Sequence, residues 1–279
     1  MTSVRGCGRA GVRAGVLAGA WLMATVSAAA ITLVSVDQEI AIGRQADLQV
    51  RQQMAAVADA QIAGYVRGLG QRLARVAPGP KYPYSFSVAD YREINAFALP
   101  GGPVWVHRGV LHSATSESQV AGVLAHEIAH IAQRHSADQL TKATLANWGL
   151  GLLGAILGNS GGAGTAQVAA SLLTNGAFLK FSRDDEREAD RVGLQILTRA
   201  GWDGRGMTEL FEVLRREASR DPAAVETFFS THPSPQDRIN QLQAEVSRTR
   251  GGTRDTKEFQ AIKARALTLA PPRKMTTQS

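Results

Sequence analysis

The segment His126-Glu127-Ile128-Ala129-His130 places two histidines four positions apart, with a glutamate next to the first. On an α-helix, positions i and i+4 lie on one face, so the two imidazoles point in the same direction. Ser116 and Gln119 have the spacing of a capping box, which predicts that the helix begins there. Apolar residues recur from Val120 to Ile131 and predict its buried face. The segment therefore predicts a half-buried helix that presents two metal ligands.

Zinc is the metal that this pattern favours, at one ion per chain. Imidazole nitrogens suit Zn²⁺, and a catalytic zinc takes three protein ligands and keeps one position open. The single cysteine, Cys7, lies in the predicted leader, so every ligand must be His, Asp or Glu. Glu127 is the candidate general base that accepts a proton from water. A solvated His/Glu face without metal is the alternative, but the adjoining apolar face disfavours it.

The third ligand has two candidate sources. His135 lies about 140° around a continuous helix from the second histidine. It is therefore predicted to face away from the metal, as a surface or packing residue. In a later acidic segment, Glu186 and Asp190 share a face at i and i+4, whereas Glu188 lies about 200° from Glu186. That face would offer Glu186 to the metal and Asp190 to a ligand histidine. Taken alone, the acidic segment is better explained as a solvated helix start favoured by the helix dipole.

The remaining pattern predicts a mainly helical α+β domain with a small β-sheet. Apolar spacing predicts one long helix over Asp37 to Val76, with Asp37 as its N-cap. Further helices are predicted over Arg183 to Ala200, Thr208 to Arg220, Ser234 to Val246 and Asp255 to Leu269. Short strands are predicted over Tyr84 to Val88, Ile94 to Leu99 and Val104 to His107.

The uncharged stretch from Asn147 to Phe178 predicts a helical hairpin around a Gly-rich break. Neither arm has the ~20 apolar residues that span a bilayer. Three roles are open for it: a lid over the cleft, a shallow membrane contact, or packing on the domain.

The N-terminus has the pattern of an export signal. Arg5, Arg9 and Arg13 precede an uncharged stretch that ends at Val34. Small residues around Ala28 offer a cleavage site, which predicts a signal peptide over residues 1–30. An uncleaved N-terminal anchor is the alternative, because the stretch is long enough to span a bilayer. Both alternatives place the domain over residues 36–246 outside the cytoplasm.

The formal net charge of +7 is concentrated at the two ends of the chain. The positive charge comes from the arginines of the leader and from a basic extension over residues 247–279. This extension is predicted to be disordered from Pro271 onward. The body between them is close to neutral, so nucleic acid is not an expected partner. A basic extension on an exported protein is equally compatible with contact to an anionic membrane surface and with no partner at all.

The motifs together resemble those of a known family. The sequence HEIAHIAQRHS, followed by the acidic segment Arg183 to Arg191, is similar to the HtpX and CAAX-prenyl-endoprotease family of zinc metallopeptidases (gluzincins). The similarity is greatest to exported bacterial members of the BepA type. It extends to Asn95 to Gly102 before the histidine motif and to Thr231 to Ser234 after it, and covers roughly Val36 to Glu245.

The resemblance implies a set of site residues. His126, His130 and Glu186 would bind zinc, and Glu127 would be catalytic. Asp190 would not bind the metal but would hydrogen-bond a ligand histidine. The resemblance also places an edge strand beside the cleft, where backbone groups pair with an extended polypeptide substrate. That strand comprises Asn95, Ala96, Phe97 and Ala98.

Two later residues are candidates for further roles. His232 precedes a proline in a turn just before a helix and is a candidate fourth, inhibitory metal ligand; the alternative is a capping or turn histidine. Arg238, one turn into that helix, is a candidate to stabilise the oxyanion of a tetrahedral intermediate. Its alternative is a solvated helix arginine.

The chain also departs from the family in two respects. Membrane-embedded members have several spanning helices, whereas this chain has at most one, at its start. BepA-type members carry a helical repeat domain after the protease domain, where this chain has only the basic extension from Ser247.

These features predict an exported zinc metalloendopeptidase that cleaves unfolded or misassembled envelope proteins. The expected location is the periplasm of a Gram-negative bacterium, with membrane association if the leader is retained. One rival is a zinc-stabilised, chaperone-like binding protein, which would not need Glu127. A second is a prenyl-protein processing enzyme, which export and the lack of several spans disfavour.

Overall fold

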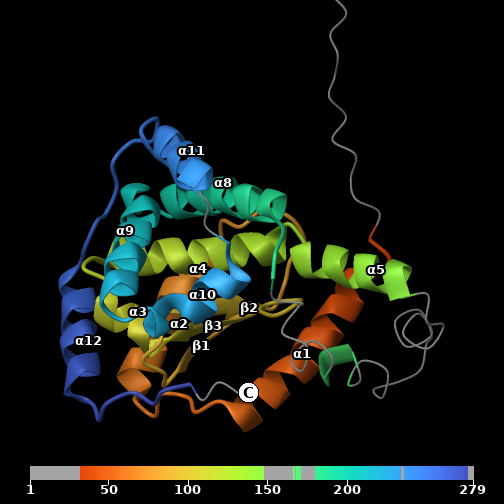
Figure 1. The fold of residues 1–279 in the computed structure, drawn as a ribbon, viewed down its shortest axis with the longest axis horizontal. Coiled ribbons are helices and arrows are strands. Elements are labelled where there is room, and N and C mark those ends of the chain that lie inside the picture. Colours follow the sequence, from red (N-terminus) through yellow and green to blue (C-terminus); the bar gives the residue numbers. More distant parts are fainter. Residues whose placement is uncertain (1–31, 148–165, 167, 171–179, 234–235, 276–279) are drawn as a thin grey trace, which may run out of the picture. The chain divides into compact units, whose positions relative to one another are not determined.

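Helix α4 (Glu117–Ala132), which carries the histidine motif, is buried along its whole length. The computed structural model describes residues 32–147, 166, 168–170, 180–233 and 236–275. Within it, α4 lies between α8 (Arg183–Arg199) on one side and a three-stranded sheet on the other (Figure 1). A helix enclosed on both sides needs an apolar surface all round, and the alanine, valine, leucine and isoleucine content of α4 supplies it.

The sheet has the strand order β1-β3-β2, with β1 over Ser85–Ala89, β2 over Ala96–Ala98 and β3 over Pro103–His107. The middle strand, β3, pairs in parallel with β1 and antiparallel with β2, where Phe97 lies opposite Trp105. The short strand β2 is therefore an edge strand, and it packs against α4. The predicted mainly helical α+β fold with a small sheet is confirmed.

The single long helix predicted over Asp37 to Val76 is wrong. The chain forms α1 (Val36–Gln53) and α2 (Ala60–Ala74), and Ser35 rather than Asp37 caps α1, in a capping box with Gln38. Between the helices, the amide of Val57 donates to Val88 of β1 at 2.9 Å. Backbone groups that pair with a strand are not available to continue a helix, so α1 ends before this segment.

The predicted start of α4 is right, but its predicted capping box is not formed. Ser116 is the N-cap residue without a side-chain cap bond. The side chain of Gln119 instead accepts from the Thr115 amide and donates to the Thr115 hydroxyl, both at 2.9 Å. The glutamine therefore fixes the loop that enters the helix.

Helices also make up most of the second half of the chain. Ser182 and Asp185 form a capping box at the start of α8, and α9 begins before the predicted Thr208. Three helices that the periodicity did not predict are α3, α5 and α10. The remaining bounds are α3 Arg108–Ser113, α5 His135–Asn147, α9 Arg205–Arg220, α10 Ala223–Thr231, α11 Gln236–Val246 and α12 Lys257–Thr268.

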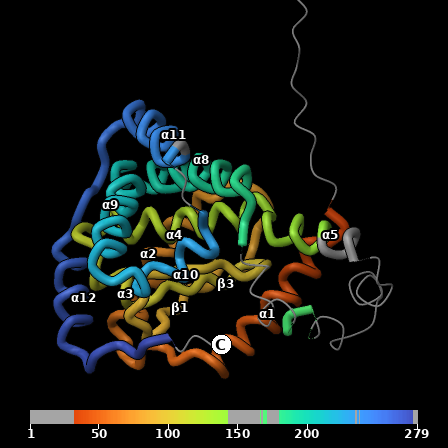
Figure 2. The backbone as a smooth tube through the Cα atoms, viewed as in Figure 1, coloured from red at the N-terminus to blue at the C-terminus, as the bar shows by residue number. Residues whose placement is uncertain are grey.

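The basic extension after residue 246 packs onto the domain. Helix α12 contacts α2 and α3, and its Phe259 is fully buried in the main core. Beyond it, Arg273 pairs with Tyr91 in a short parallel bridge, although the sequence predicted disorder from Pro271 onward. Figure 2 follows this last segment, in dark blue, from α12 back past the strands. Pairing with the residues just after β1 supplies the order that the local sequence does not indicate.

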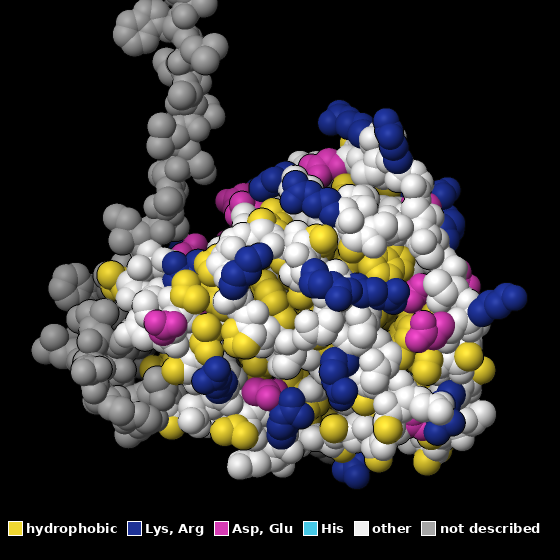
Figure 3. All heavy atoms as spheres, turned by 180° about the vertical axis from the view of Figure 1, so that it is seen from behind, with side chains coloured by type: hydrophobic (Ala, Val, Ile, Leu, Met, Phe, Trp, Pro, Cys, Tyr) yellow, Lys and Arg dark blue, Asp and Glu magenta, His cyan; other side chains and the backbone are white. Residues whose placement is uncertain are grey.

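Some predicted features fall outside the described residues. The predicted leader over residues 1–30 does, as does most of the predicted hairpin over residues 147–178, and so do Ser234 and Pro235 at the predicted start of α11. Among the described helices, none is both long and apolar enough to cross a bilayer. On the face seen in Figure 3, lysine and arginine side chains are spread out with acidic ones between them, not gathered in one patch.

Candidate metal centre

Four buried side chains meet beside α4: His126, His130, Glu186 and His232. Each offers a ligand atom, and these atoms all lie within 4.8 Å of one another. The two histidines of α4 are neighbours on one helix face, Glu186 comes from the first turns of α8, and His232 follows the end of α10. Elements distant in the sequence thus converge on one point.

A glycine permits the close approach of α8 to α4. A Cβ atom at Gly193 would lie 3.1 Å from the Cα of His126, which is tighter than ordinary packing. Further back along α8, Glu186 and Asp190 are both buried toward α4, whereas Glu188 is about half exposed. The i, i+4 spacing in α8 therefore directs Glu186 to the Nε2 atoms of both histidines and Asp190 to Nδ1 of His126.

The separations between the ligand atoms fit a tetrahedral zinc site. Zinc–nitrogen bonds of 2.0–2.1 Å at tetrahedral angles put neighbouring ligand atoms roughly 3.3 Å apart. The Nε2 atoms of His126 and His130 are 3.0 Å apart. Oxygens of Glu186 lie 3.5 Å from Nε2 of His126 and 3.4 Å from Nε2 of His130. These three side chains form one triangular face with the dimensions that zinc needs.

Glu127 lies next to this triangle and is fully buried. Neither of its oxygens has a well-aligned hydrogen-bond partner in the described part of the chain, and the Nε2 atom of His232 is 3.5 Å from Oε1. Burial raises the pKa of Glu127, and the imidazoles of His232 and His126 offset only part of the effect. A buried carboxylate with free lone pairs and a raised pKa is suited to accept a proton.

Asp190 holds the other edge of the His126 ring. Its Oδ1 lies 3.1 Å from Nδ1 of His126, so Nε2 is directed at the ligand triangle. Burial alone would lower the pKa of His126, but hydrogen bonds to Asp190 and Glu186 raise it to about 10. The carboxylates thus favour positive charge at this end of the site. Burial lowers the pKa of His130 well below its usual value, so that ring is neutral, as a metal ligand must be.

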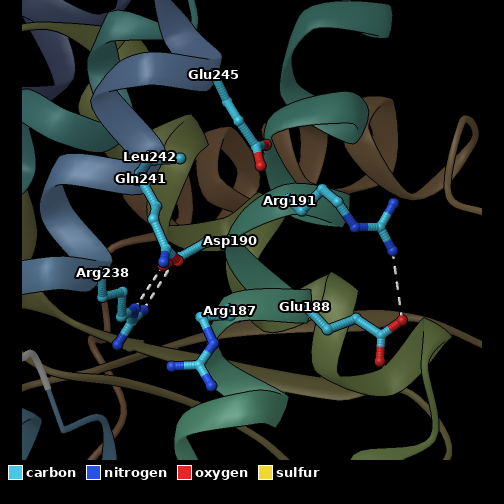
Figure 4. Close-up of a pocket in the computed structure, with 8 residues that line it drawn as sticks. All are labelled: Arg187, Glu188, Asp190, Arg191, Arg238, Gln241, Leu242 and Glu245. Carbon is cyan, nitrogen blue, oxygen red and sulfur yellow. Dashed lines mark hydrogen bonds and ion pairs between the residues drawn. The ribbon is translucent and has the colours of Figure 1, made fainter.

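Arg238 contacts both buried carboxylates of α8, the candidate ligand Glu186 and the supporting Asp190. Figure 4 shows it reaching from α11 to Asp190, with which it makes two hydrogen bonds; the Nη2–Oδ1 bond measures 2.8 Å. Its Nη1 contacts Glu186 and the Pro233 carbonyl. Burial opposes the charge of Asp190, but the hydrogen bonds and charges of Arg238 and His126 together outweigh it and lower the Asp190 pKa. Arg238 is buried and engaged in these contacts, so the solvated alternative is wrong; its oxyanion role stays a prediction.

His232 lies inside the cluster, not on the surface. It is 1% exposed, and its Nδ1 lies 2.9 Å from Oε1 of Glu186. Its ring therefore connects the third candidate ligand with the candidate base Glu127. The sequence indicated this histidine only by its place in a turn, and its role as a fourth ligand stays a prediction.

His135 lies outside the ligand cluster, but the chain leading to it is not the continuous helix that the prediction assumed. The prediction assumed that α4 continues, but the helix ends at Ala132 and Arg134 adopts a left-handed φ of 62°. His135 is outside the ligand cluster, yet it is buried, and its Nδ1 lies 2.8 Å from Nδ1 of His130. Phe181, which the sequence analysis did not single out, stacks on the other face of His130 with ring centroids 3.8 Å apart.

The predicted edge-strand residues are buried beside the site. Asn95 to Ala98 lie on or next to β2, and the Ala98 amide is among the groups that stabilise the Glu127 carboxylate. A small pocket opens next to Glu127 with a mostly apolar wall of Val123, Met207, Leu210, Phe211 and Phe228. A second pocket, of about 260 Å³, lies behind the Asp190–Arg238 pair between α8 and α11, and charges of both signs line it (Figure 4).

Comparisons with known proteins give a family match and several relatives. The sequence model of peptidase family M48 matches residues 60–246. The "Beta-barrel assembly-enhancing protease" of Escherichia coli is 35% identical over 244 residues, which cover 84% of this chain and 49% of that protein. The protein of the same name from Yersinia pestis is 34% identical over 228 residues, 78% of this chain and 46% of the relative.

A mitochondrial relative is also similar. The "Mitochondrial metalloendopeptidase OMA1" of Schizosaccharomyces pombe is 38% identical over 149 residues, which cover 53% of this chain and 42% of that protein. The chain thus spans about half the length of the bacterial relatives it matches.

Proposed function

Because the chain belongs to peptidase family M48, a family of zinc metallopeptidases, we propose that it is a zinc-dependent endopeptidase. One observation carries the proposal: His126, His130 and Glu186 form a buried triangle of zinc-ligand dimensions, and beside it lies the buried carboxylate of Glu127, which has no well-aligned hydrogen bond in the described residues. A purely structural zinc site needs no such carboxylate.

The reaction we propose is hydrolysis of a peptide bond. Zinc, when bound, supplies a Lewis acid that polarises the scissile carbonyl and makes water a stronger acid. Glu127 accepts the proton of the attacking water and passes it to the departing amine. Asp190 orients the His126 ring while this occurs, and the buried surroundings limit access of other water. The backbone of β2 pairs with the extended substrate beside Glu127.

The substrates we propose are unfolded or misassembled proteins of the cell envelope, in the periplasm of a Gram-negative bacterium. Two observations support this. The predicted export signal directs the chain out of the cytoplasm. The similar bacterial proteins carry the name "Beta-barrel assembly-enhancing protease". Recognition through backbone pairing at β2 requires an extended segment, which an unfolded client offers and a folded one does not.

His232 is proposed as a switch at the same site. Its position among the ligand atoms supports a fourth contact that closes the position a substrate needs. In this arrangement the closed form is inactive, and movement of the turn after α10 opens it.

The test is a comparison of wild type with Glu127→Gln. The variant keeps the shape of the side chain but cannot accept the proton, so cleavage of casein should fall by about 10²-fold or more. Zinc content, measured by atomic absorption, should be unchanged. Glu212→Gln is the matched control, because it makes the same change at an exposed site on α9 and should retain full activity.

Two outcomes would overturn the proposal. Full casein cleavage by Glu127→Gln contradicts the role of the base. A zinc-loaded wild type that suppresses client aggregation but never yields fragments contradicts hydrolysis and supports the chaperone-like alternative.

A further inference from the structure

The Nδ1 atom of His130, on the ring edge opposite the ligand triangle, contacts another histidine. The Nδ1 atoms of His130 and His135 are 2.8 Å apart, a distance at which one must donate a proton and the other accept it. Both side chains are almost fully buried, at 0% and 2% exposed. A buried polar nitrogen without a partner is costly, so this contact satisfies a need of both rings.

An unusual bend brings His135 into this position. Arg134 adopts φ 62°, a left-handed conformation that disfavours residues with a side chain. The Arg134 guanidinium holds the bend by donating to Glu39 of α1 at 2.8 Å and to the Val34 carbonyl. The helical run is thereby interrupted between α4 and α5 (Figure 1), and the first residue of α5 lies against His130.

The position of the ligand triangle fixes the direction of the hydrogen bond. Nε2 of His130 faces Glu186, so in a metal ligand the ring proton must sit on Nδ1. His130 then donates to Nδ1 of His135, which must keep its own proton on Nε2. That Nε2 lies 3.5 Å from Oε2 of Glu188, within ion-pair distance, and makes no hydrogen bond in the described residues.

Two side chains hold the Glu188 carboxylate, the last group in the series of contacts from His130 through His135. Gln133 donates to its Oε1 at 2.6 Å, and Arg191 lies 3.4 Å from the same oxygen, as Figure 4 shows for the arginine. The two ligand histidines therefore have parallel supports. His126 has a direct carboxylate, Asp190, whereas His130 reaches a carboxylate through a second imidazole.

We propose that His135 is a positioning residue that fixes the ring orientation and tautomer of His130, with Glu188 as the carboxylate end of the relay. The inference rests on the proposed zinc site, because it concerns how one ligand of that site is oriented. Outer contacts of this kind typically change metal affinity by about 10–100-fold.

The experiment measures the zinc dissociation constant of the full chain by competition with a chromophoric chelator. His135→Phe keeps an aromatic ring but loses the acceptor, so its affinity should fall by about 10–100-fold. His135→Asn offers a carbonyl acceptor and should recover part of the loss. His112→Phe is the control, because it removes a histidine that bonds the Ala266 carbonyl far from the ligands; its affinity should match wild type.

A second readout separates positioning from packing. In ¹⁵N NMR of the zinc-loaded wild type, His130 should be the Nδ1–H tautomer and His135 the Nε2–H tautomer. Glu188→Ala, at a half-exposed site, tests the relay without disturbing the core and should weaken zinc binding by several-fold. If His135→Phe does not fold, the zinc affinity of Glu188→Ala serves as the test of the relay.

The outcomes distinguish this inference from the proposed function. Unchanged zinc affinity in Glu188→Ala and in whichever His135 variants fold, or the opposite tautomers, overturns the relay alone. A wild type that binds zinc but does not cleave casein overturns the proposed function and leaves the relay to be judged by affinity. A wild type that binds no zinc overturns both.

Discussion

At the scale of single residues, His107 at the end of β3 makes stability depend on pH. Its ring is fully buried, and Nδ1 lies 3.2 Å from the Glu93 carbonyl. Burial lowers the pKa of His107 to about 4. The unfolded chain therefore takes up a proton near pH 6.5, while the folded one does so only near pH 4. The contribution of His107 to the unfolding free energy is therefore fully present above pH 6.5 and is lost as the pH falls from 6.5 to about 4.

We expect His107 to account for a loss of up to about 3 kcal/mol in unfolding free energy between pH 7 and pH 4. Urea denaturation of wild type and His107→Asn at several pH values measures it. The variant should lose less stability over this range than wild type does. Parallel pH dependences for the two proteins would show that His107 does not contribute.

For single residues of the site, helix geometry predicted which side chains share a face, and the family resemblance predicted that the acidic pair lies at the site. The pairs His126 with His130 and Glu186 with Asp190 each lie on one face at i, i+4, and both pairs meet in the structure. His135 was not predictable in the same way. Its contact depends on a left-handed bend at Arg134 that Glu39, far away in the sequence, holds in place.

At the scale of elements, the separation of α4 and α8 determines the ligand geometry. Gly193→Ala should lower the unfolding free energy by about 1–3 kcal/mol, because the added methyl presses on the backbone at His126. It should also weaken zinc binding, since Glu186 moves with α8. Thermal unfolding and chelator competition measure the two effects.

Gly64→Ala is the matched control for this prediction. It lies on α2 with open space around the added Cβ atom. Alanine favours a helix over glycine by up to about 1 kcal/mol, so this variant should be slightly more stable than wild type. If both glycine variants behave alike, the tight contact at Gly193 does not constrain the helices.

Elements were predictable where the apolar period is long and a cap marks the end, as for α4 and α8. The break between α1 and α2 was not, because the segment over residues 54–59 is held by backbone bonds to β1 that no local pattern reveals. Helix α10 is nine residues long and buries only two of them, so its periodic signal is weak.

At the scale of the whole molecule, the extension after residue 246 is part of the core. Phe259→Ala should lower the unfolding free energy by about 3–5 kcal/mol, because it removes a fully buried ring that packs beside Tyr65. Leu267→Ala, on the same helix but 57% exposed, should change stability by less than about 0.5 kcal/mol. Equal effects, measured by urea denaturation, would mean that α12 does not stabilise the domain.

The buried carboxylates around the metal centre set a balance of charge. When Glu127 is deprotonated, as a base must be, it and Glu186 and Asp190 together carry three negative charges, and Arg238 is the buried guanidinium that contacts the latter two. When the imidazoles are neutral, as metal ligands must be, these four groups leave two negative charges uncompensated in a buried region. An ion of charge +2 neutralises them, whereas one of charge +1 leaves an excess. We therefore expect the carboxylates and the arginine together to favour a divalent ion, and the histidines to favour zinc among the divalent ions.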